Sequence, residues 1–343
     1  MRMVRSCLRH AIPLWALAAL SVPAGVAAEP EARVLKAEGS GSLTSVAISG
    51  DGHWLAQTEH SLVRVWDLKA GKVLRSWKPP ERTSGELHSV AFSPDGKCLA
   101  VAAAGYSCEI LVYDTATGKL LWRKMTRESS EIRLSFSPDG KWLVSTGDFS
   151  KPGSKEGNLL NVFRAEDGEL QRGLQGTRDS LLGELGEYVP ITFAPDGKTV
   201  AAVSGRGKLT LWDIESGKAA PEIPLDKDIG CISALAFSPD GKVLAVGTIK
   251  SVFLWDLTEG KRLRVLSERK SPVAGLNSGE ALLLQFSADG ASVFAFLDGK
   301  LQAWDAKTGT KRAAPGVVWS RASAFSANRK VLASGFNVYQ IPE

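Results

Sequence analysis

Apolar and polar residues alternate in short runs along most of this chain, and the runs come in pairs around one recurring turn. The turn Phe-Ser-Pro-Asp-Gly-Lys occupies residues 92–97 and returns at residues 136–141 and 237–242. Its Pro fixes φ at the second turn position, and its Gly accepts the left-handed backbone at the fourth. Because an alternating run lies on either side of the turn, each copy predicts a hairpin of two antiparallel strands.

The hairpins belong to a longer repeat of four short strands. In the first repeat the pattern predicts strands at residues 43–49, 54–57, 62–67 and 73–77. The turn glycine returns with a step of 44 residues, from Gly52 to Gly96 to Gly140. A period of this length with four strands is typical of the blades of a β-propeller.

Six repeats are complete, and the seventh lacks a fourth strand. The seventh runs from Ser323 to Ile341, and the apolar segment Ala32–Lys36 precedes the first repeat without a partner of its own. An open ring would leave strand edges with unpaired amides and carbonyls. We therefore expect the N-terminal segment to supply the missing strand and to close the ring.

A Trp-Asp pair ends the third strand in four repeats, whereas the third repeat has Phe163-Arg164 instead. The pairs are Trp66-Asp67, Trp212-Asp213, Trp255-Asp256 and Trp304-Asp305. Together with the recurring turn, they resemble the WD-repeat β-propellers, in a bacterial exported form. The resemblance implies an all-β, seven-bladed β-propeller of four-stranded antiparallel sheets, closed by the N-terminal strand in the last blade. These Trp and Asp residues then have a structural role, in which the Asp caps the turn that follows.

Two features of that family are not regularly present in this chain. They are a Gly-His pair before the inner strand, and an Asp between the second and third strands that joins the Trp in a hydrogen-bonded network. We therefore expect packing of Trp and Phe to carry more of the stability, at about 3–5 kcal/mol for each truncated aromatic.

The first 28 residues are predicted to be a secretory signal peptide, followed by the propeller at residues 29–343. Three Arg precede a short apolar run at residues 11–20, and Val26 and Ala28 give the small-residue spacing of a cleavage site. Removal of the three Arg from 42 basic residues leaves 39 against 37 acidic ones. The near-neutral mature chain, without a basic run interleaved with aromatics, argues against a nucleic-acid partner. We expect a periplasmic or extracellular protein with no remaining membrane span.

The cysteines do not indicate a disulfide framework. Cys98, Cys108 and Cys231 follow the predicted leader, an odd number scattered over the repeats. Pairing of the strands about Gly105 places Cys98 opposite Tyr113 rather than opposite Cys108.

No residue pattern indicates catalysis, a cofactor or a metal. The turn aspartates form a ring on one face, but packed sheets lie about 10 Å apart, too far for the short oxygen ligation of calcium. Only three histidines follow the leader. Of these, His88 begins an inner strand and could face the central channel.

Binding is expected on the face opposite the recurring turn, because the connections there differ in length. Variable loops on a rigid scaffold are the usual place for binding. The candidate partner-binding residues on this face are His88, Tyr188, Trp319 and Arg321. Two hypotheses follow: a monomeric, non-enzymatic scaffold that binds a protein, or a propeller enzyme or small-molecule binder that works in the central channel. The lack of clustered catalytic groups favours the scaffold.

Overall fold

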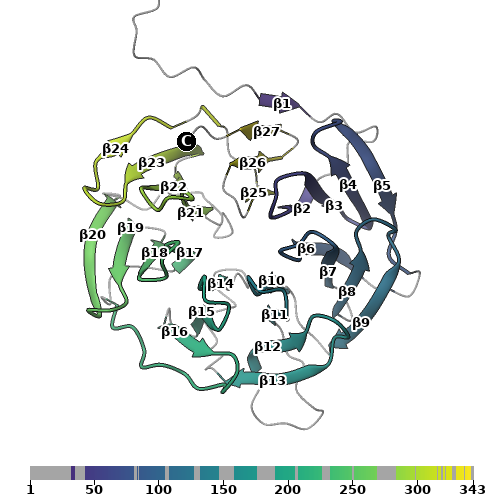
Figure 1. Cartoon of the computed structure of the whole chain (residues 1–343), viewed down its shortest axis with the longest axis horizontal. Helices are drawn as coiled ribbons and strands as arrows, with labels where there is room; N and C mark the ends of the chain where they lie inside the picture. Colours follow the sequence, from purple (N-terminus) through teal and green to yellow (C-terminus); the bar gives the residue numbers. More distant parts are fainter. Residues whose placement is uncertain are drawn as a thin grey trace, which may run out of the picture.

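The computed structural model is a ring of seven antiparallel β-sheets, which confirms the predicted seven-bladed β-propeller (Figure 1). The structure describes residues 32–34, 43–80, 83, 85–104, 108–126, 132–146, 158–175, 190–204, 208–225, 232–248, 251–268, 283–297, 299–314, 316–317, 320, 322–326, 330–335 and 337–340. Throughout these residues every regular element is a strand. The same residues contain no helix of the length and apolarity that a membrane crossing needs. The predicted leader, residues 1–28, lies outside them and stays a prediction.

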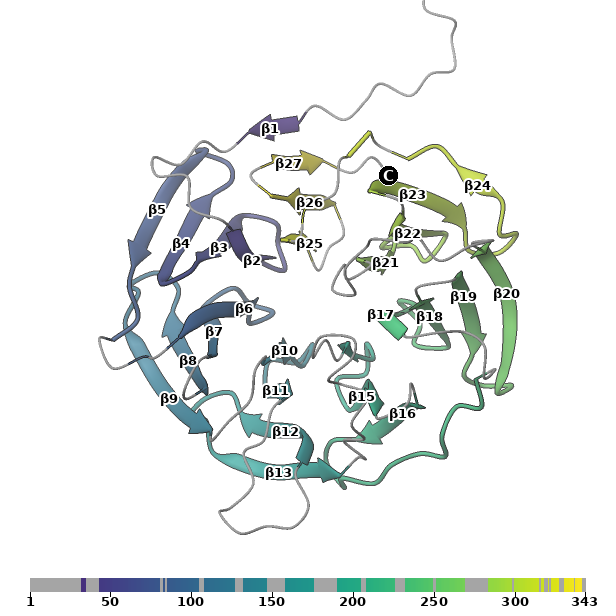
Figure 2. The same ribbon diagram turned by 180° about the vertical axis from the view of Figure 1, so that it is seen from behind.

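Each blade runs from an inner strand near the ring axis to an outer strand at the rim (Figures 1 and 2). The inner strands are β2 (Leu43–Ile48), β6 (Glu86–Phe92), β10 (Leu134–Phe136), β14 (Ile191–Phe193), β17 (Ile232–Phe237), β21 (Leu284–Phe286) and β25 (Ser323–Phe325). The second strands are β3 (Trp54–Glu59), β7 (Cys98–Ala104), β11 (Trp142–Thr146), β15 (Thr199–Ser204), β18 (Val243–Thr248), β22 (Ser292–Leu297) and β26 (Val331–Ser334). The third strands are β4 (Leu62–Asp67), β8 (Cys108–Asp114), β12 (Asn158–Arg164), β16 (Lys208–Asp213), β19 (Ser251–Asp256), β23 (Lys300–Asp305) and β27 (Asn337–Gln340). The outer strands are β5 (Lys72–Trp77), β9 (Leu120–Thr126), β13 (Leu170–Gln175), β20 (Lys261–Glu268), β24 (Lys311–Arg312) and β1 (Ala32–Val34).

The ring closes in blade 7, as the sequence predicts. β1 pairs antiparallel with β27, with Ala32 opposite Tyr339 and Val34 opposite Asn337. The strand order β1-β27-β26-β25 therefore joins the two ends of the described chain in one sheet. Counting from β2, blades 1 to 6 follow in chain order.

Blade 4 departs from the four-stranded pattern at its outer edge. Its regular sheet contains only β14, β15 and β16, and the segment that follows touches β16 through two isolated bridges, Trp212 to Ala219 and Leu209 to Ile223. Pro221 lies between the bridged residues and has no backbone N–H to donate. A continuous outer strand cannot form there.

The apolar core consists of seven clusters, and each lies between two neighbouring blades. In β4, Val63 and Val65 pack against blade 2, whereas Trp66 packs on the other side against blade 7. This division follows from the alternation of side chains along a strand. The stability of each blade therefore depends on its neighbours.

The recurring turn is held by its Ser and Asp side chains. In blade 2, the Cys98 amide donates to Ser93 Oγ at 2.9 Å, and Ser93 Oγ donates to Asp95 Oδ1 at 2.7 Å. Gly96 has φ of +70°, the left-handed backbone that the sequence predicts at this position. Blade 4 has Ala194 in place of Ser, and there Thr199 supplies a hydroxyl to its turn Asp instead, at 2.9 Å.

The predicted register of β7 and β8 is wrong by one residue. Cys98 lies opposite Asp114, and Tyr113 lies opposite Leu99. The centre of the connection is one position later than Gly105, which changes the partner of each residue. Among the described residues, neither Cys98 nor Cys108 forms a disulfide.

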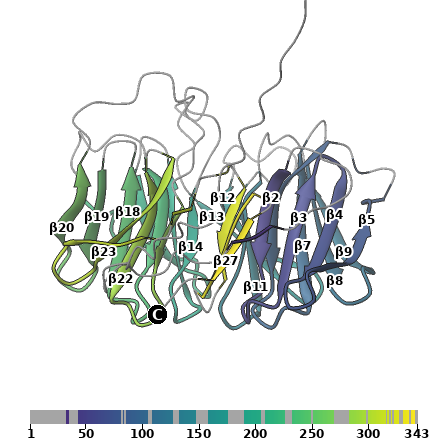
Figure 3. The same ribbon diagram turned by 90° about the horizontal axis from the view of Figure 1, so that it is seen from above.

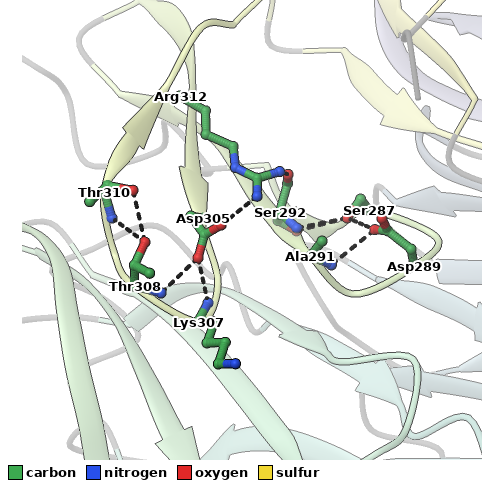
Figure 4. Close-up of polar contacts among 9 residues, drawn as sticks. All are labelled: Ser287, Asp289, Ala291, Ser292, Asp305, Lys307, Thr308, Thr310 and Arg312. Carbon is green, nitrogen blue, oxygen red and sulfur yellow. Dashed lines mark hydrogen bonds and ion pairs between the residues drawn. The ribbon is translucent and has the colours of Figure 1, made fainter.

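The Asp of each Trp-Asp pair caps the turn that follows it, as predicted. Asp305 Oδ1 accepts from the amides of Lys307 at 2.9 Å and Thr308 at 2.7 Å, and its other oxygen accepts from Arg312 (Figure 4). Arg312 also donates to Ser292 Oγ at 2.6 Å. Asp67, Asp213 and Asp256 accept amide hydrogen bonds from their own turns in the same way.

We predict that the propeller loses stability in acid through the capping carboxylate of Asp305. The backbone hydrogen bond from Thr308 and the Arg312 guanidinium lower the pKa of Asp305 from its ordinary 3.8 to about 2. A carboxylate whose pKa is lowered in the folded state stabilises the fold above its unfolded pKa and loses that effect as pH falls. Melting temperature should therefore be flat above about pH 5 and fall between about pH 4 and pH 2.

Asp305→Asn is the matched variant, because it keeps an acceptor for the turn amides but removes the charge. Its melting temperature should be lower than that of wild type at pH 7, and the difference should shrink as pH approaches 2. A difference that is the same at both pH values would contradict the role of the carboxylate.

Besides the apolar clusters, the blades also contact each other at the rim. Trp122 of β9 donates from Nε1 to Ala165 O at 2.9 Å, in the turn between β12 and β13 of blade 3. In the same turn Gly168 has φ of +69°, and a Cβ added there would lie 2.5 Å from Trp122 Cε3. In three other blade pairs an arginine side chain lies against the equivalent turn glycine: Arg75 against Gly118, Arg172 against Gly217 and Arg264 against Gly309.

Candidate functional site

The two faces of the ring differ in what the described strands place on them (Figure 3). We call the face with the recurring turns, such as residues 93–96, the turn face. We call the opposite face, where the inner strands begin, the loop face. On the loop face, Trp77 of β5 is followed by β6 at Glu86, whereas β13 ends at Gln175 and the next inner strand begins only at Ile191. The predicted variation in length is therefore present on this face.

Of the four predicted partner-binding residues, the structure describes only one. Tyr188, Trp319 and Arg321 lie outside the described residues. His88 lies near the loop-face end of β6 and is partly buried.

His88 occupies a β-bulge. The register of β6 against β7 shifts between Leu87 and Ser89, so His88 is the extra residue. The same shift recurs at Thr44 in β2 and at Ser233 in β17. Bulges of this kind turn one side chain out of the regular ladder. The three bulged residues each lie four positions before the last residue of their inner strand. This equal spacing is visible in the sequence, but the alternation of apolar residues does not mark the position as a bulge.

The bulged positions differ in their chemistry. Thr44 Oγ1 donates to Thr58 O at 3.0 Å, and Ser233 Oγ donates to Gly247 O at 3.4 Å. Within the described residues His88 has no such hydrogen bond. Blade 2 therefore presents an imidazole where two other blades present a hydroxyl that is used internally.

Two further titratable side chains lie next to His88 on the loop face. His60 Nε2 lies 3.7 Å from Glu86 Oε1, and His60 O accepts from the Leu87 amide at 2.7 Å. His60 has φ of +38°, which is uncommon for a residue other than Gly. Backbone strain of this kind concentrates at functional sites. His60, Glu86 and His88, which we call the blade 1–2 edge, form the candidate site.

A buried polar network lies on the blade 7 side of this edge. Arg64 is paired with Glu59, and both side chains are about nine-tenths buried. Trp66 Nε1 donates to Gln57 Oε1 at 2.7 Å, and Gln57 Nε2 lies 3.5 Å from Gly335 O of blade 7. In blade 1, Gln57 therefore takes the place of the hydrogen-bonded network of the family. Trp66 contributes a hydrogen bond to the stability of the blade as well as packing.

The interface between blades 1 and 2 also contains a carboxylate with an unsatisfied oxygen. Glu109 of β8 is fully buried, and Thr83 donates to its Oε2 at 3.3 Å. Among the described residues its Oε1 has no hydrogen-bond partner, and the same is true of Tyr113 Oη on the same face of β8. Burial, with a smaller contribution from Glu109, raises the pKa of Tyr113 to about 12.

We predict that Glu109→Met raises the stability of the protein. A buried carboxylate oxygen without a partner has lost its hydration, so an apolar side chain of similar length should add about 1–3 kcal/mol to the free energy of unfolding. Urea unfolding measures the change. Glu59→Met is the control, because it removes the carboxylate that pairs with the buried Arg64 and should destabilise. Destabilisation by both variants would show that both carboxylate oxygens of Glu109 have hydrogen-bond partners.

The turn face does not form a metal centre among the described residues. The turns of neighbouring blades lie closer than the expected 10 Å: a Cβ added at Gly140 would lie 3.6 Å from Pro94 Cδ. Neighbouring turns therefore touch, and each turn carboxylate accepts hydrogen bonds within its own turn, as Asp95 does from Ser93 and Lys97. In the described part of the chain, no group of three or more His, Cys, Asp and Glu is placed to hold a metal ion.

Comparison with known families agrees with this architecture. Residues 59–315 match the family model described as outer membrane protein assembly factor BamB, and residues 31–67 match the WD domain, G-beta repeat. The first match covers more than half of the chain, so the chain belongs to this family. With its Trp-Asp repeats it is a WD-repeat β-propeller.

Three curated relatives are similar over part of the chain. An uncharacterized WD repeat-containing protein of Synechocystis sp. is 29% identical over 48% of this chain and 42% of its own length. A periodic tryptophan protein 2 homolog of Schizosaccharomyces pombe is 26% identical over 54% of this chain and 22% of its own. The small ribosomal subunit protein RACK1 of Candida albicans is 30% identical over 37% of this chain and 39% of its own length. The matches therefore span less than half the length of each relative.

Proposed function

We propose that this protein is an exported, non-enzymatic scaffold of the bacterial envelope that acts as a monomer and binds another protein through its loop face. The observation that carries the proposal is the composition of the seven inner strands. Their described residues contain two ionisable side chains, Glu86 and His88, and both belong to β6. A channel enzyme needs catalytic groups that converge from several blades.

Further support comes from the N-terminal sequence and from the family. The predicted signal peptide gives a route for export, and the matching family is described by a protein of outer membrane assembly. WD-repeat propellers are interaction modules in general. The blade 1–2 edge offers an exposed His60 and Glu86 beside His88, which are polar groups suited to the rim of a protein interface.

Site-specific photo-crosslinking in bacterial cells tests the proposal. A photoreactive residue at position 88 should give a discrete crosslinked protein in the envelope fraction, and one at Lys218 on the turn face should not. His88→Ala should lose the same partner in pull-downs. No crosslink at position 88 would overturn the loop-face assignment. A small molecule that co-purifies and is released on denaturation would instead favour a binder in the central channel.

A further inference from the structure

The rim of the propeller carries an unusual combination of charge and exposed apolar side chains. The described outer strands β5, β9, β13, β20 and β24 contain ten Lys and Arg but only one acidic residue, Glu268. Every large hydrophobic side chain that is exposed in the described residues also lies on these strands. Basic residues alone are explained as protection of a strand edge, but exposed aliphatic residues work against that protection.

The strand β9 shows this combination in its clearest form. Leu121 and Met125 are 46% and 56% exposed, and Met125 is the most exposed of the large hydrophobics. Arg123 lies two residues before Met125 and shares its face of the strand, whereas Leu121 is the extra residue of a β-bulge against β8. Within the described residues, Arg123 and Lys124 have no ion-pair or hydrogen-bond partner. The two cations are therefore available to another molecule.

The backbone of β9 is fixed on one side and open on the other. Six of its seven residues pair with β8, from Thr126 opposite Cys108 to Leu120 opposite Tyr113, and Leu121 is the extra residue of a β-bulge. On the opposite face of the strand, Trp122 is buried and bonded to Ala165 of blade 3. β9 is the last strand of its sheet, so its outer edge has no strand partner among the described residues (Figure 2). A rigid strand with one open edge is a template for strand addition.

We propose that β9 binds an extended, acidic segment of a partner protein, which adds to blade 2 as a fifth strand. The open edge supplies backbone hydrogen bonds, Leu121 and Met125 supply apolar contact, and Arg123 with Lys124 select acidic side chains. The inference rests on the proposed role as a scaffold, names a class of partner for it, and adds the rim of blade 2 as a binding surface separate from the loop face.

An anionic lipid surface would also suit cations and aliphatic residues, but the open edge disfavours it. Unpaired amides and carbonyls are costly in the hydrocarbon region, where strands are found only in closed barrels. An added strand satisfies these groups instead. The edge therefore favours a polypeptide over a membrane.

Binding of defined peptides to the purified protein tests the proposal. The probe is a fluorescein-labelled peptide of about ten residues that alternates Glu with Val, a pattern with high strand propensity. It should bind at low salt, with at least about tenfold higher affinity than the same peptide with Lys in place of Glu. An acidic peptide with Pro at its centre should bind about tenfold more weakly, because Pro cannot donate to the ladder. Hydrogen exchange should show protection of amides in residues 120–126 when the acidic peptide is bound.

Charge reversal gives the matched pair of variants. Arg123→Glu with Lys124→Glu should lose binding of the acidic peptide by at least about tenfold. Lys218→Glu with Lys307→Glu, the same change on the turn face, should leave it unchanged. An equal loss of affinity for the acidic peptide in both double variants would overturn strand addition. Peptide binding without protection of the amides of residues 120–126 from hydrogen exchange would do the same. Binding of phosphatidylglycerol vesicles that depends on Arg123 and Lys124, without peptide binding, would replace it by a membrane role. Because no cellular partner is needed, this test can fail while crosslinking at position 88 succeeds.

Discussion

Gly168→Ala is expected to lower the free energy of unfolding by about 3 kcal/mol, from backbone strain and overpacking together. Gly168 has φ of +69°, where an L residue is strained, and the new Cβ would lie 2.5 Å and 2.6 Å from Trp122 Cε3 and Cδ2. The indole is fixed by its hydrogen bond to Ala165, so it cannot move without loss of that bond. The variant would therefore disturb the contact between blades 2 and 3 at the rim. Urea unfolding followed by circular dichroism measures the change.

Gly260→Ala is a matched control within the same chain. Gly260 occupies the equivalent turn of blade 5, with φ of +64°, and a Cβ there would meet nothing within 4 Å. Blade 4 has no regular outer strand to cover this turn. The control should cost only the backbone strain, about 1–2 kcal/mol. Equal losses in the two variants would show that Trp122 does not hold the turn.

Replacing Ala32-Arg33-Val34 by Gly-Ser-Gly should lower the free energy of unfolding by about 2–3 kcal/mol, at about 1 kcal/mol for each backbone hydrogen bond lost. The change keeps the chain length but removes the strand preference of β1. Without β1, strand β27 becomes an open edge, so its amides should exchange faster with solvent. Thermal unfolding and hydrogen exchange measure the two effects.

The location of the exchange effect distinguishes ring closure from a general loss of stability. Faster exchange should be confined to β27 and its neighbours in blade 7, and β11 and β12 on the other side of the ring should be unchanged. An unchanged melting temperature together with unchanged exchange at Val338 would show that β1 does not close the ring.

The repeat could be predicted from the sequence because each of its signals is local. A turn such as residues 93–96 needs Pro and Gly at fixed positions, and the flanking strands need only alternation of apolar side chains. The number of blades and the closure by Ala32–Val34 followed from repetition of these signals. The capping role of Asp305 was predictable for the same reason, since the amides of Lys307 and Thr308 that donate to its carboxylate lie within three residues of it.

The candidate site was less accessible to prediction. His88 could be placed at the start of an inner strand, but its bulge depends on the pairing of β6 with β7. Its neighbour His60 belongs to a different blade and carries no motif. The partner residues predicted at 188, 319 and 321 lie outside the described residues and stay predictions.

By itself, the sequence determined the fold class, the seven repeats, the turn face and the closing strand, since all of these depend on periodicity and on turn chemistry. Tertiary structure decided which residues meet between blades, such as Trp122 with Gly168 and Gln57 with Gly335. These contacts join residues whose separation in the chain is set by packing of one sheet on another. No local pattern encodes such contacts, because the facing blade supplies half of each one.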